Sequence, residues 1–335
     1  MRISAVALMF LVLAGPANAI PTVGTVRSLA ILTIFADDEQ AGLCQQAPLS
    51  PPCNSLIAQA ALNTVSAYFS EASYGLFTFL GDVVGPFTLP MNRNEASRST
   101  VAQLAQSAAE SVGVNLAAYG HFIYASTCCW AGFGEPFGNE MWRGDGGGLG
   151  SYWFLAHEIG HNLGLTHAMG PLSCGGGASE YGDPIDPMGS GNGHYGVPNK
   201  LALGWLNGRT LKVTQGGRYT VLPYESAISG GVQALVIPAT AKKLGAVTYT
   251  VEYRQPIGFD ADPLADPANV FGGAMLHVET SLLDGTSETC TTAGAKDPAF
   301  VPGRSYCDPD RNVLVSVVSV GASLVVDVDL RSRCR

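Results

Sequence analysis

Charge is scarce in this 335-residue chain: Asp, Glu, Lys and Arg make up 13% of the residues, and the net charge is −9. The sequence has no run of Lys or Arg, so it lacks the basic patch that binds nucleic acid phosphates. Disorder is excluded, because 47% of the residues are hydrophobic and can form a sizeable core. We therefore expect a folded protein that does not bind nucleic acid.

Long apolar segments are also missing. The apolar run from Ile3 to Ala14 is too short to span a bilayer, and no stretch of spanning length follows it. Arg2 precedes this run, and Ala17-Asn18-Ala19 after it matches a signal peptidase site. These features predict a signal peptide over residues 1–19 and a secreted chain that begins near Ile20, without a membrane anchor; the alternative is that the segment is itself an anchor.

The sequence has no C-x-x-C pair, which argues against a thiolate zinc site and against a thioredoxin-like redox motif. It has eight cysteines, and an even number in an exported chain indicates disulfides. Two local pairs are the simplest, Cys44 with Cys53 and Cys290 with Cys307. Adjacent cysteines form a strained ring and are not expected to bond to each other. The cysteines left without an assigned partner are Cys128, Cys129, Cys174 and Cys334.

The first two thirds of the chain mix two hydrophobic periodicities. Spacing of three and four residues predicts helices, and short apolar or alternating runs predict strands. The segment 130–151 is Gly-rich and is expected to form loops or an edge strand. The predicted helices are 55–68, 99–118 and 152–163; the predicted strands are 27–36, 76–80, 83–89 and 122–125, with a Gly-Asp turn between the second and third of these strands.

The pattern changes near residue 210. Helical periodicity ends, and short strand-like runs alternate with Gly, Pro, Asp and Asn. This pattern predicts an all-β, sandwich-like module at the C-terminus. The predicted strands are 218–222, 234–237, 247–253, 274–278, 313–320 and 323–330.

The most informative segment runs from His157 to His167 and reads HEIGHNLGLTH. His157 and His161 are four residues apart, so a helix places both imidazoles on one face. Gly164 lets the chain leave that helix, and His167 can then supply a third nitrogen. Three protein ligands and one water are typical of a catalytic zinc site. Glu158 lies beside the first ligand, where it can act on a water molecule without occupying a ligand position.

This segment matches the zinc signature of the metzincins, H-E-x-x-H-x-x-G-x-x-H. Metzincins also carry a downstream Met turn, and Asp186-Pro187-Met188-Gly189 is similar to it. The surrounding sequence resembles the gametolysin family of secreted metalloproteases. The segments that carry this resemblance are Glu71–Gly75, Gly81–Pro86, Glu180–Asp183, Lys200–Leu206 and Val251–Arg254.

The resemblance implies an α+β fold. Its metzincin-like catalytic domain, with a mixed sheet and an active-site helix, covers residues 20–210, and an all-β C-terminal domain covers residues 211–335. It implies a secreted endopeptidase that cleaves proteins or peptides by means of a zinc-activated water. The implied ligands of one Zn2+ are His157, His161 and His167, with Glu158 as general base and Met188 as a structural residue. We expect a monomer.

Some site predictions have competing explanations. Tyr195 or His194 could stabilise the oxyanion, but Tyr195 lies seven residues after Met188 rather than two, and packing of the loop is the favoured explanation. His121 and His277 are expected to be hydrogen-bonded structural residues. Two polar clusters could bind Ca2+ but are also typical of solvated turns: Asp260, Asp262 and Asp266, and Asp308, Asp310 and Asn312.

Two alternatives to a protease remain open. The chain could be a zinc-binding adhesion module without proteolysis, although such a module would be expected to lack the Glu or a ligand, and all four residues are present. It could also be a zinc amidase that acts on a cell-wall polymer, because neither the motif nor the fold excludes that substrate.

Overall fold

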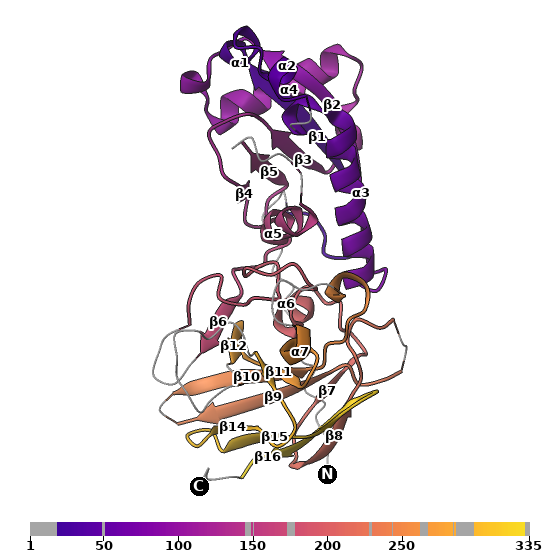
Figure 1. The fold of residues 1–335 in the computed structure, drawn as a ribbon, viewed down its shortest axis with the longest axis vertical. Coiled ribbons are helices and arrows are strands. Elements are labelled where there is room, and N and C mark those ends of the chain that lie inside the picture. The colour runs from indigo at the N-terminus through magenta and orange to yellow at the C-terminus, as the bar shows by residue number, and fades with distance from the viewer. Residues whose placement is uncertain are drawn as a thin grey trace, which may run out of the picture.

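The computed structural model describes residues 19–48, 51–144, 149, 151–172, 178–227, 230–242, 244–261, 267–283, 285 and 298–331. Residues 1–18 of the predicted signal peptide lie outside this set, as do Cys174, Cys290, Cys334, Asp262 and Asp266. Figure 1 shows an elongated molecule with one sheet towards one end and two sheets towards the other; helix α5 (Tyr152–Asn162) lies between them.

The N-terminal sheet has five strands in the order β2-β1-β3-β5-β4. Four strands are parallel, and β4 is an antiparallel edge strand. The mixed character that was predicted from the sequence is therefore observed. The strands are β1 (Gly24–Phe35), β2 (Phe77–Leu89), β3 (His121–Ala125), β4 (Phe133–Gly134) and β5 (Glu140–Arg143).

Helices cover both faces of this sheet. Alternate residues of β1 point to opposite faces, as the two-residue period of a strand requires. Ala30 and Leu32 share a core with α3 (Ser55–Ala72) and α5. Leu29 and Ile31 share another core with α4 (Arg98–Ser111). Further short helices are α1 (Ala36–Gln40), α2 (Leu43–Gln46), η1 (Pro51–Cys53), η2 (Arg93–Glu95) and η3 (Leu116–Ala118).

The C-terminal part contains two sheets that share one hydrophobic core, so the predicted β-rich module is observed. The first has the order β6-β12-β11-β10-β9-β7, with β13 paired to β11, and the second has the order β14-β15-β16-β8. The elements are β6 (Met169–Leu172), α6 (Val197–Ala202), β7 (Thr210–Lys212), β8 (Gly217–Val221), β9 (Ala234–Ala241), β10 (Gly245–Glu252), η4 (Gly258–Asp260), α7 (Pro267–Val270), β11 (Ala274–Val278), β12 (Ser281–Leu283), β13 (Ala299–Phe300), β14 (Ser305–Asp308), β15 (Val313–Val320) and β16 (Leu324–Asp329).

One strand of these C-terminal sheets comes from far earlier in the chain. Strand β6 begins two residues after His167, and it pairs in parallel with β12. The backbone N–H of Met169 also donates to the carbonyl of Thr280. The segment that follows the third predicted ligand is therefore part of the C-terminal sheet. The division into domains at residue 210 stays a prediction.

Two secondary-structure predictions were wrong. The Gly-Asp turn between residues 80 and 83 does not exist, because β2 runs unbroken and Gly81 and Asp82 pair with Ser28 and Leu29 of β1. Parallel pairing along the whole of β1 outweighs the local turn signal. The helix predicted over residues 99–118 ends at Ser111, where Gly113 takes a positive φ of 90° and stops it.

The cysteine predictions divide into one success and one correction. Cys44 and Cys53 are bonded, as expected. Cys128 and Cys129, which were not expected to bond to each other, form a disulfide between neighbours. Cys129 has a positive φ of 86°, a backbone conformation that the expectation of a strained ring did not take into account. Cys307 is also disulfide-bonded.

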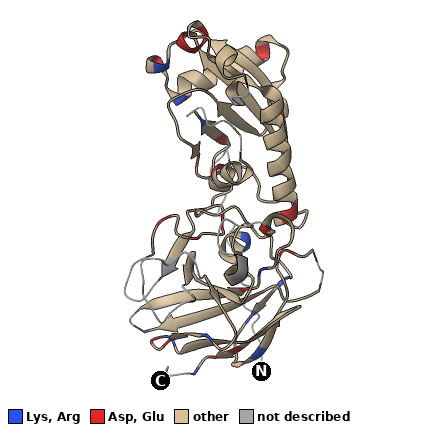
Figure 2. Cartoon of the chain, in the orientation of Figure 1, with Lys and Arg blue, Asp and Glu red and all other residues tan. Residues whose placement is uncertain are grey.

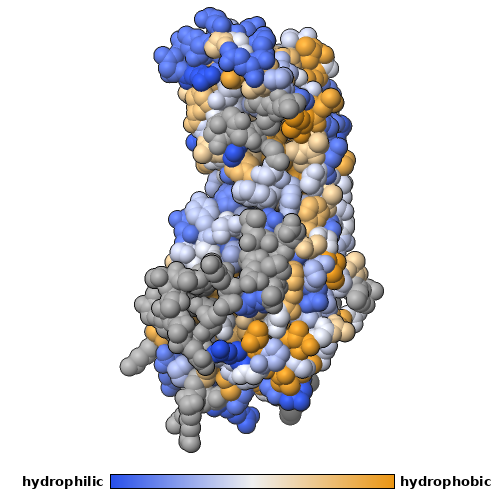
Figure 3. All heavy atoms as spheres, in the orientation of Figure 1, coloured by the Kyte–Doolittle hydropathy of each residue, from blue (hydrophilic) through white to orange (hydrophobic). Residues whose placement is uncertain are grey.

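Figure 2 shows that Lys and Arg are thinly scattered over the fold, without a basic stripe in this view. Hydrophilic residues gather at the end of the molecule that carries α1 and α2 (Figure 3). Among the described residues, no helix combines the length and apolarity that a bilayer crossing needs.

Candidate metal centre

Helix α5 brings two of the predicted ligands to one face. Leu155, Ala156 and Ile159 are fully buried and pack against α3 and the sheet. The opposite face carries His157 and His161, which are partly exposed. The amphipathic sequence thus fixes the rotation of the helix, and the rotation fixes where the two imidazoles point.

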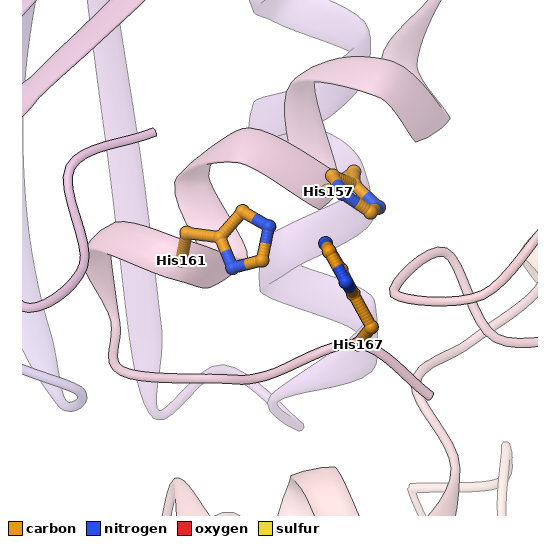
Figure 4. Close-up of side chains that lie close together, drawn as sticks. All are labelled: His157, His161 and His167. Atoms are coloured by element: carbon orange, nitrogen blue, oxygen red, sulfur yellow. The ribbon is translucent and has the colours of Figure 1, made fainter. Parts of the chain in front are cut away.

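The third predicted ligand arrives through a turn at the end of α5. Gly164 has a φ of 94°, a conformation that side chains rarely adopt, and the N–H of Leu165 donates to the carbonyl of Gly160. The chain then returns past the helix, so that one nitrogen from each of His157, His161 and His167 lies within 4.8 Å of the other two. Figure 4 shows the three rings converging.

Each of the three rings is oriented by a hydrogen bond from its Nδ1 atom. His157 donates to the carbonyl of Pro187 at 2.7 Å, and His161 donates to the carbonyl of Leu165 at 2.9 Å. His167 donates to the carboxylate of Glu180 at 2.6 Å. Because carbonyls and carboxylates accept, Nδ1 carries the proton and Nε2 keeps its lone pair. This arrangement is the usual support of metal-binding histidines.

The electrostatics favour the neutral form of two of these rings, His157 and His161. Burial lowers the pKa of His157 to about 4 and also lowers the pKa of His161. A neutral imidazole is the form that binds a metal. Three histidine nitrogens around one point match the donor set of a catalytic zinc site, which leaves a coordination position open. The residues that are present therefore fit a zinc ion.

Glu158 lies next to the triad but is not part of it. Its side chain is 7% exposed, and its Oε2 accepts a 2.6 Å hydrogen bond from the N–H of Gly134 in edge strand β4. Burial raises the pKa of Glu158 to about 7, against the opposing effects of the Gly134 N–H and Arg143. A carboxylate with a pKa near neutrality can both accept and return a proton.

The Met turn lies directly beneath α5. Met188 is fully buried, and the N–H of Ala168, next to the third ligand, donates to its carbonyl. A Cβ atom on Gly160 would lie 2.4 Å from the Met188 sulfur, so the helix and the turn approach closely only because residue 160 is glycine. Asp186 orients the turn by accepting from the N–H of Met188.

The two residues considered as oxyanion donors are fully buried. The hydroxyl of Tyr195 donates to the carbonyl of Ala156 at 2.6 Å. His194 contacts Glu71 at 2.8 Å through Nε2 and Lys200 at 3.0 Å through Nδ1. Their polar groups are therefore engaged inside the protein. The aromatic residue that the structure places against the triad is Tyr181, whose ring centroid lies 3.9 Å from that of His167.

A second group of ionisable residues is buried between α6 and strands β10 and β11, and we call it the buried polar network. Arg254 is its centre and contacts Glu252 at 2.7 Å and Asp260 at 3.2 Å. Asp186 accepts from the N–H of Gly196 at 2.6 Å. The network consists of Asp183, Asp186, His194, Lys200, Glu252, Arg254, Asp260 and His277.

Charges in this network shift one another. Burial raises the pKa of Asp186, and the neighbouring Asp183 raises it further. Burial lowers the pKa of Lys200 to about 7. Burial lowers the pKa of His277, but the carboxylates of Asp183 and Glu252 together outweigh this effect and the pKa is raised. His277 is thus a hydrogen-bonded structural residue, as expected. His121 is another, held by Ser28 and Asn162.

Glu180, Tyr181 and five residues of the network were not among the predicted site residues; the five are Asp183, Asp186, Lys200, Glu252 and Arg254. The signal in the sequence was that all of them lie in the Met turn or in three segments that resemble the gametolysin family: Glu180–Asp183, Lys200–Leu206 and Val251–Arg254. The calcium prediction also stays untested. Of its residues, Asp260 belongs to the network, and Asp308 accepts from the N–H groups of Asp310 and Arg311 in its own turn.

The fold and the three-histidine cluster together describe a protein with a candidate metal centre on a helix beside a mixed sheet. A family model described as "Gametolysin peptidase M11" matches residues 54–254, which is more than half of the chain and includes the whole cluster. The chain belongs to this gametolysin family of peptidases, as the resemblance implied.

Other comparisons add little. No curated protein matches the chain significantly. One similar solved structure, described as "Structure of a chaperone-substrate complex", is 15% identical over 43% of this chain, with a TM-score of 0.26. The chain spans 24% of that structure's length, and so low a score supports no argument about fold or function.

Proposed function

We propose that this protein is a secreted, zinc-dependent endopeptidase. The observation that carries the proposal is the set of three Nε2 atoms turned towards one point, each fixed by a Nδ1 hydrogen bond, with Glu158 beside them. His157, His161 and His167 would hold the ion. Zinc bound there would polarise the scissile carbonyl and make a water molecule more acidic.

The residues of this chain would carry the proton transfers. Glu158 accepts the proton of the attacking water and later gives it to the leaving amine, a role that its raised pKa suits. The Gly134 N–H holds this carboxylate in place. Edge strand β4 has one side without a partner strand in the described sheet, so an extended peptide could pair there beside Glu158.

Two substitutions test the mechanism. Glu158→Gln keeps the shape of the side chain and removes its basic oxygen, so the zinc content should remain near one per chain while turnover falls by roughly 10²–10⁴-fold. His161→Ala removes a ligand and should lose the metal. Glu110→Gln, an exposed change at the end of α4, is the matched control and should change neither quantity.

The measurements are elemental analysis for zinc and cleavage of a denatured protein, with and without a chelator. Undiminished cleavage by Glu158→Gln would exclude the proposed base. A zinc-loaded wild-type protein that cleaves no peptide bond in a broad substrate panel would favour a binding module, and release of fragments from a cell-wall polymer by the same preparation would favour an amidase.

A further inference from the structure

Tyr181 is an aromatic residue that lies against the candidate metal centre from the solvent side. Its side chain is 44% exposed, so the hydrophobic core does not require it. Its ring centroid lies 3.9 Å from that of His167 and 5.8 Å from that of His157. The ring planes are inclined by 38° and 23° respectively, so the phenol ring lies roughly face-on to both ligands.

The backbone holds Tyr181 in an unfavourable conformation. Its φ is 59°, in the left-handed region that is unfavourable for a bulky residue. The neighbouring chain imposes this conformation: Ser179 pairs with Gly170, and the N–H of Gly182 donates to the carbonyl of Ser179. A Cβ atom on Gly182 would lie 1.6 Å from the carbonyl oxygen of Gly170, so the turn has no room to relax there. Strained residues of this kind cluster at functional sites.

The Tyr181 hydroxyl is available as a hydrogen-bond donor. Within the described part of the chain it has no hydrogen-bond partner, whereas the hydroxyl of Tyr195 is engaged with the carbonyl of Ala156. Such a hydroxyl can donate to a substrate that is bound at the centre.

A peptidase needs a donor of this kind. When water adds to the scissile carbonyl, negative charge develops on the carbonyl oxygen, and a positioned donor stabilises the transition state more than the substrate. We propose that Tyr181 is a catalytic residue whose hydroxyl donates a hydrogen bond to this oxygen. The role rests on the proposed peptidase function. No bond to Tyr181 forms or breaks, and the phenol proton stays on its own oxygen throughout.

The stacking against His167 explains how an exposed side chain is held for this role. His167 is itself fixed by Glu180, the residue that precedes Tyr181, at 2.6 Å. One short segment therefore orients the third ligand through Glu180 and covers it with the ring of Tyr181. A donor held on the ligand set needs little reorganisation when charge develops, which is the condition for efficient electrostatic catalysis.

The test removes the hydroxyl and keeps the ring. Tyr181→Phe in the zinc-loaded mature protein should lower kcat by about 10²-fold while KM changes by no more than a few-fold. Its zinc content, and its zinc affinity measured by competition with a chelator, should equal those of the wild type. A phosphinic peptide, which carries a tetrahedral anionic centre, should bind about 10²-fold more weakly in calorimetry. Tyr219→Phe in β8 makes the same chemical change outside the centre and should change none of these quantities.

Three outcomes would overturn the inference. An unchanged kcat in Tyr181→Phe would show that the hydroxyl is not used. A raised KM with an unchanged kcat would assign Tyr181 to substrate packing, and loss of zinc would assign it to support of the ligands. Failure of the proposed function is recognised separately, because then the wild type cleaves no peptide and Glu158→Gln removes no activity. In that case the phosphinic peptide does not resemble a transition state of this protein, and its binding does not test Tyr181.

Discussion

The candidate metal centre and the buried polar network are two clusters of ionisable residues in one molecule, and they differ in exposure and in how their donor atoms converge. In the metal centre each histidine has one nitrogen bonded to the protein and another that faces a common point. In the network Arg254, Asp186 and His277 are fully buried, and their contacts are made within the protein. The first cluster can accept a ligand, whereas the second joins parts of the fold.

Shifted pKa values do not separate these clusters. Burial raises the pKa of Glu158 beside the metal centre, and it also raises the pKa of Asp186 in the network. A perturbed pKa is often used to find catalytic groups, but structural ion pairs are perturbed as well. Convergence of three histidine nitrogens and partial exposure to solvent distinguish the candidate metal centre, because Arg254 and His277 of the network also keep buried atoms without a hydrogen-bond partner.

The largest effect on stability is expected from Arg254→Met. This change leaves the carboxylates of Glu252 and Asp260 buried without their cation, and breaking such a pair typically costs about 3–5 kcal/mol. Urea denaturation followed by fluorescence measures the loss. Arg218→Met removes the exposed pair with Asp327 and should change stability little. Equal effects from the two variants would contradict the structural role of the network.

The next largest effect is expected at acid pH, where protonation of His121 should lower the free energy of unfolding. His121 is buried and has neutral partners. Burial lowers its pKa to about 4, against a normal value of 6.5, so the unfolded chain binds the proton first as the pH falls. The contribution of neutral His121 to the free energy of unfolding is therefore fully present above pH 6.5. It is lost between pH 6.5 and 4, by about 3 kcal/mol in total. In His121→Gln the free energy of unfolding should depend less steeply on pH across this window. An unchanged slope in denaturant titrations would show that His121 does not titrate as its surroundings require.

Glu180→Gln tests the candidate metal centre rather than the buried polar network, and it should lower zinc affinity. The amide can still accept from the Nδ1 of His167, but it loses the negative charge that strengthens this bond. Changes of this kind usually lower metal affinity by about 10–100-fold. Competition with a chromogenic chelator measures the affinity, with Glu110→Gln as the control. Unchanged zinc affinity would mean that Glu180 only neighbours the ligand.

The smallest effect is expected from Met188→Leu. The two side chains have similar volumes, so a buried exchange should cost less than about 1.5 kcal/mol. Zinc content and most of the activity should remain, because no ligand is touched. Complete loss of zinc from the folded variant would show that Met188 has more than a packing role.

The sequence predicted best what depends on local geometry. The spacing of His157 and His161 places both on one helix face, and Gly164 permits the turn that returns His167, so three rings could be brought together without knowledge of the remaining fold. The long helix α3 and the run of C-terminal strands follow equally from periodicity and turn residues.

Contacts between distant segments could not be predicted in this way. Glu180 lies 13 residues beyond His167, and their contact depends on the pairing of Ser179 with Gly170. The unbroken course of β2 through Gly81 depends on its pairing with β1, which lies some 50 residues earlier in the chain. Local signals describe one segment at a time, whereas both features are set by where another segment lies.

The pairing of β6 with β12 has a consequence for how this protein can be inherited or recombined. Strand β6 starts two residues after His167, yet its partner belongs to the C-terminal sheet. A chimera that took everything after residue 210 from a relative would replace β12, the strand that pairs with β6. The segment that follows His167 would then pair with a strand from another protein. The candidate metal centre and the C-terminal sheets should therefore evolve together. Chimeras between family members should fold when both regions come from the same parent.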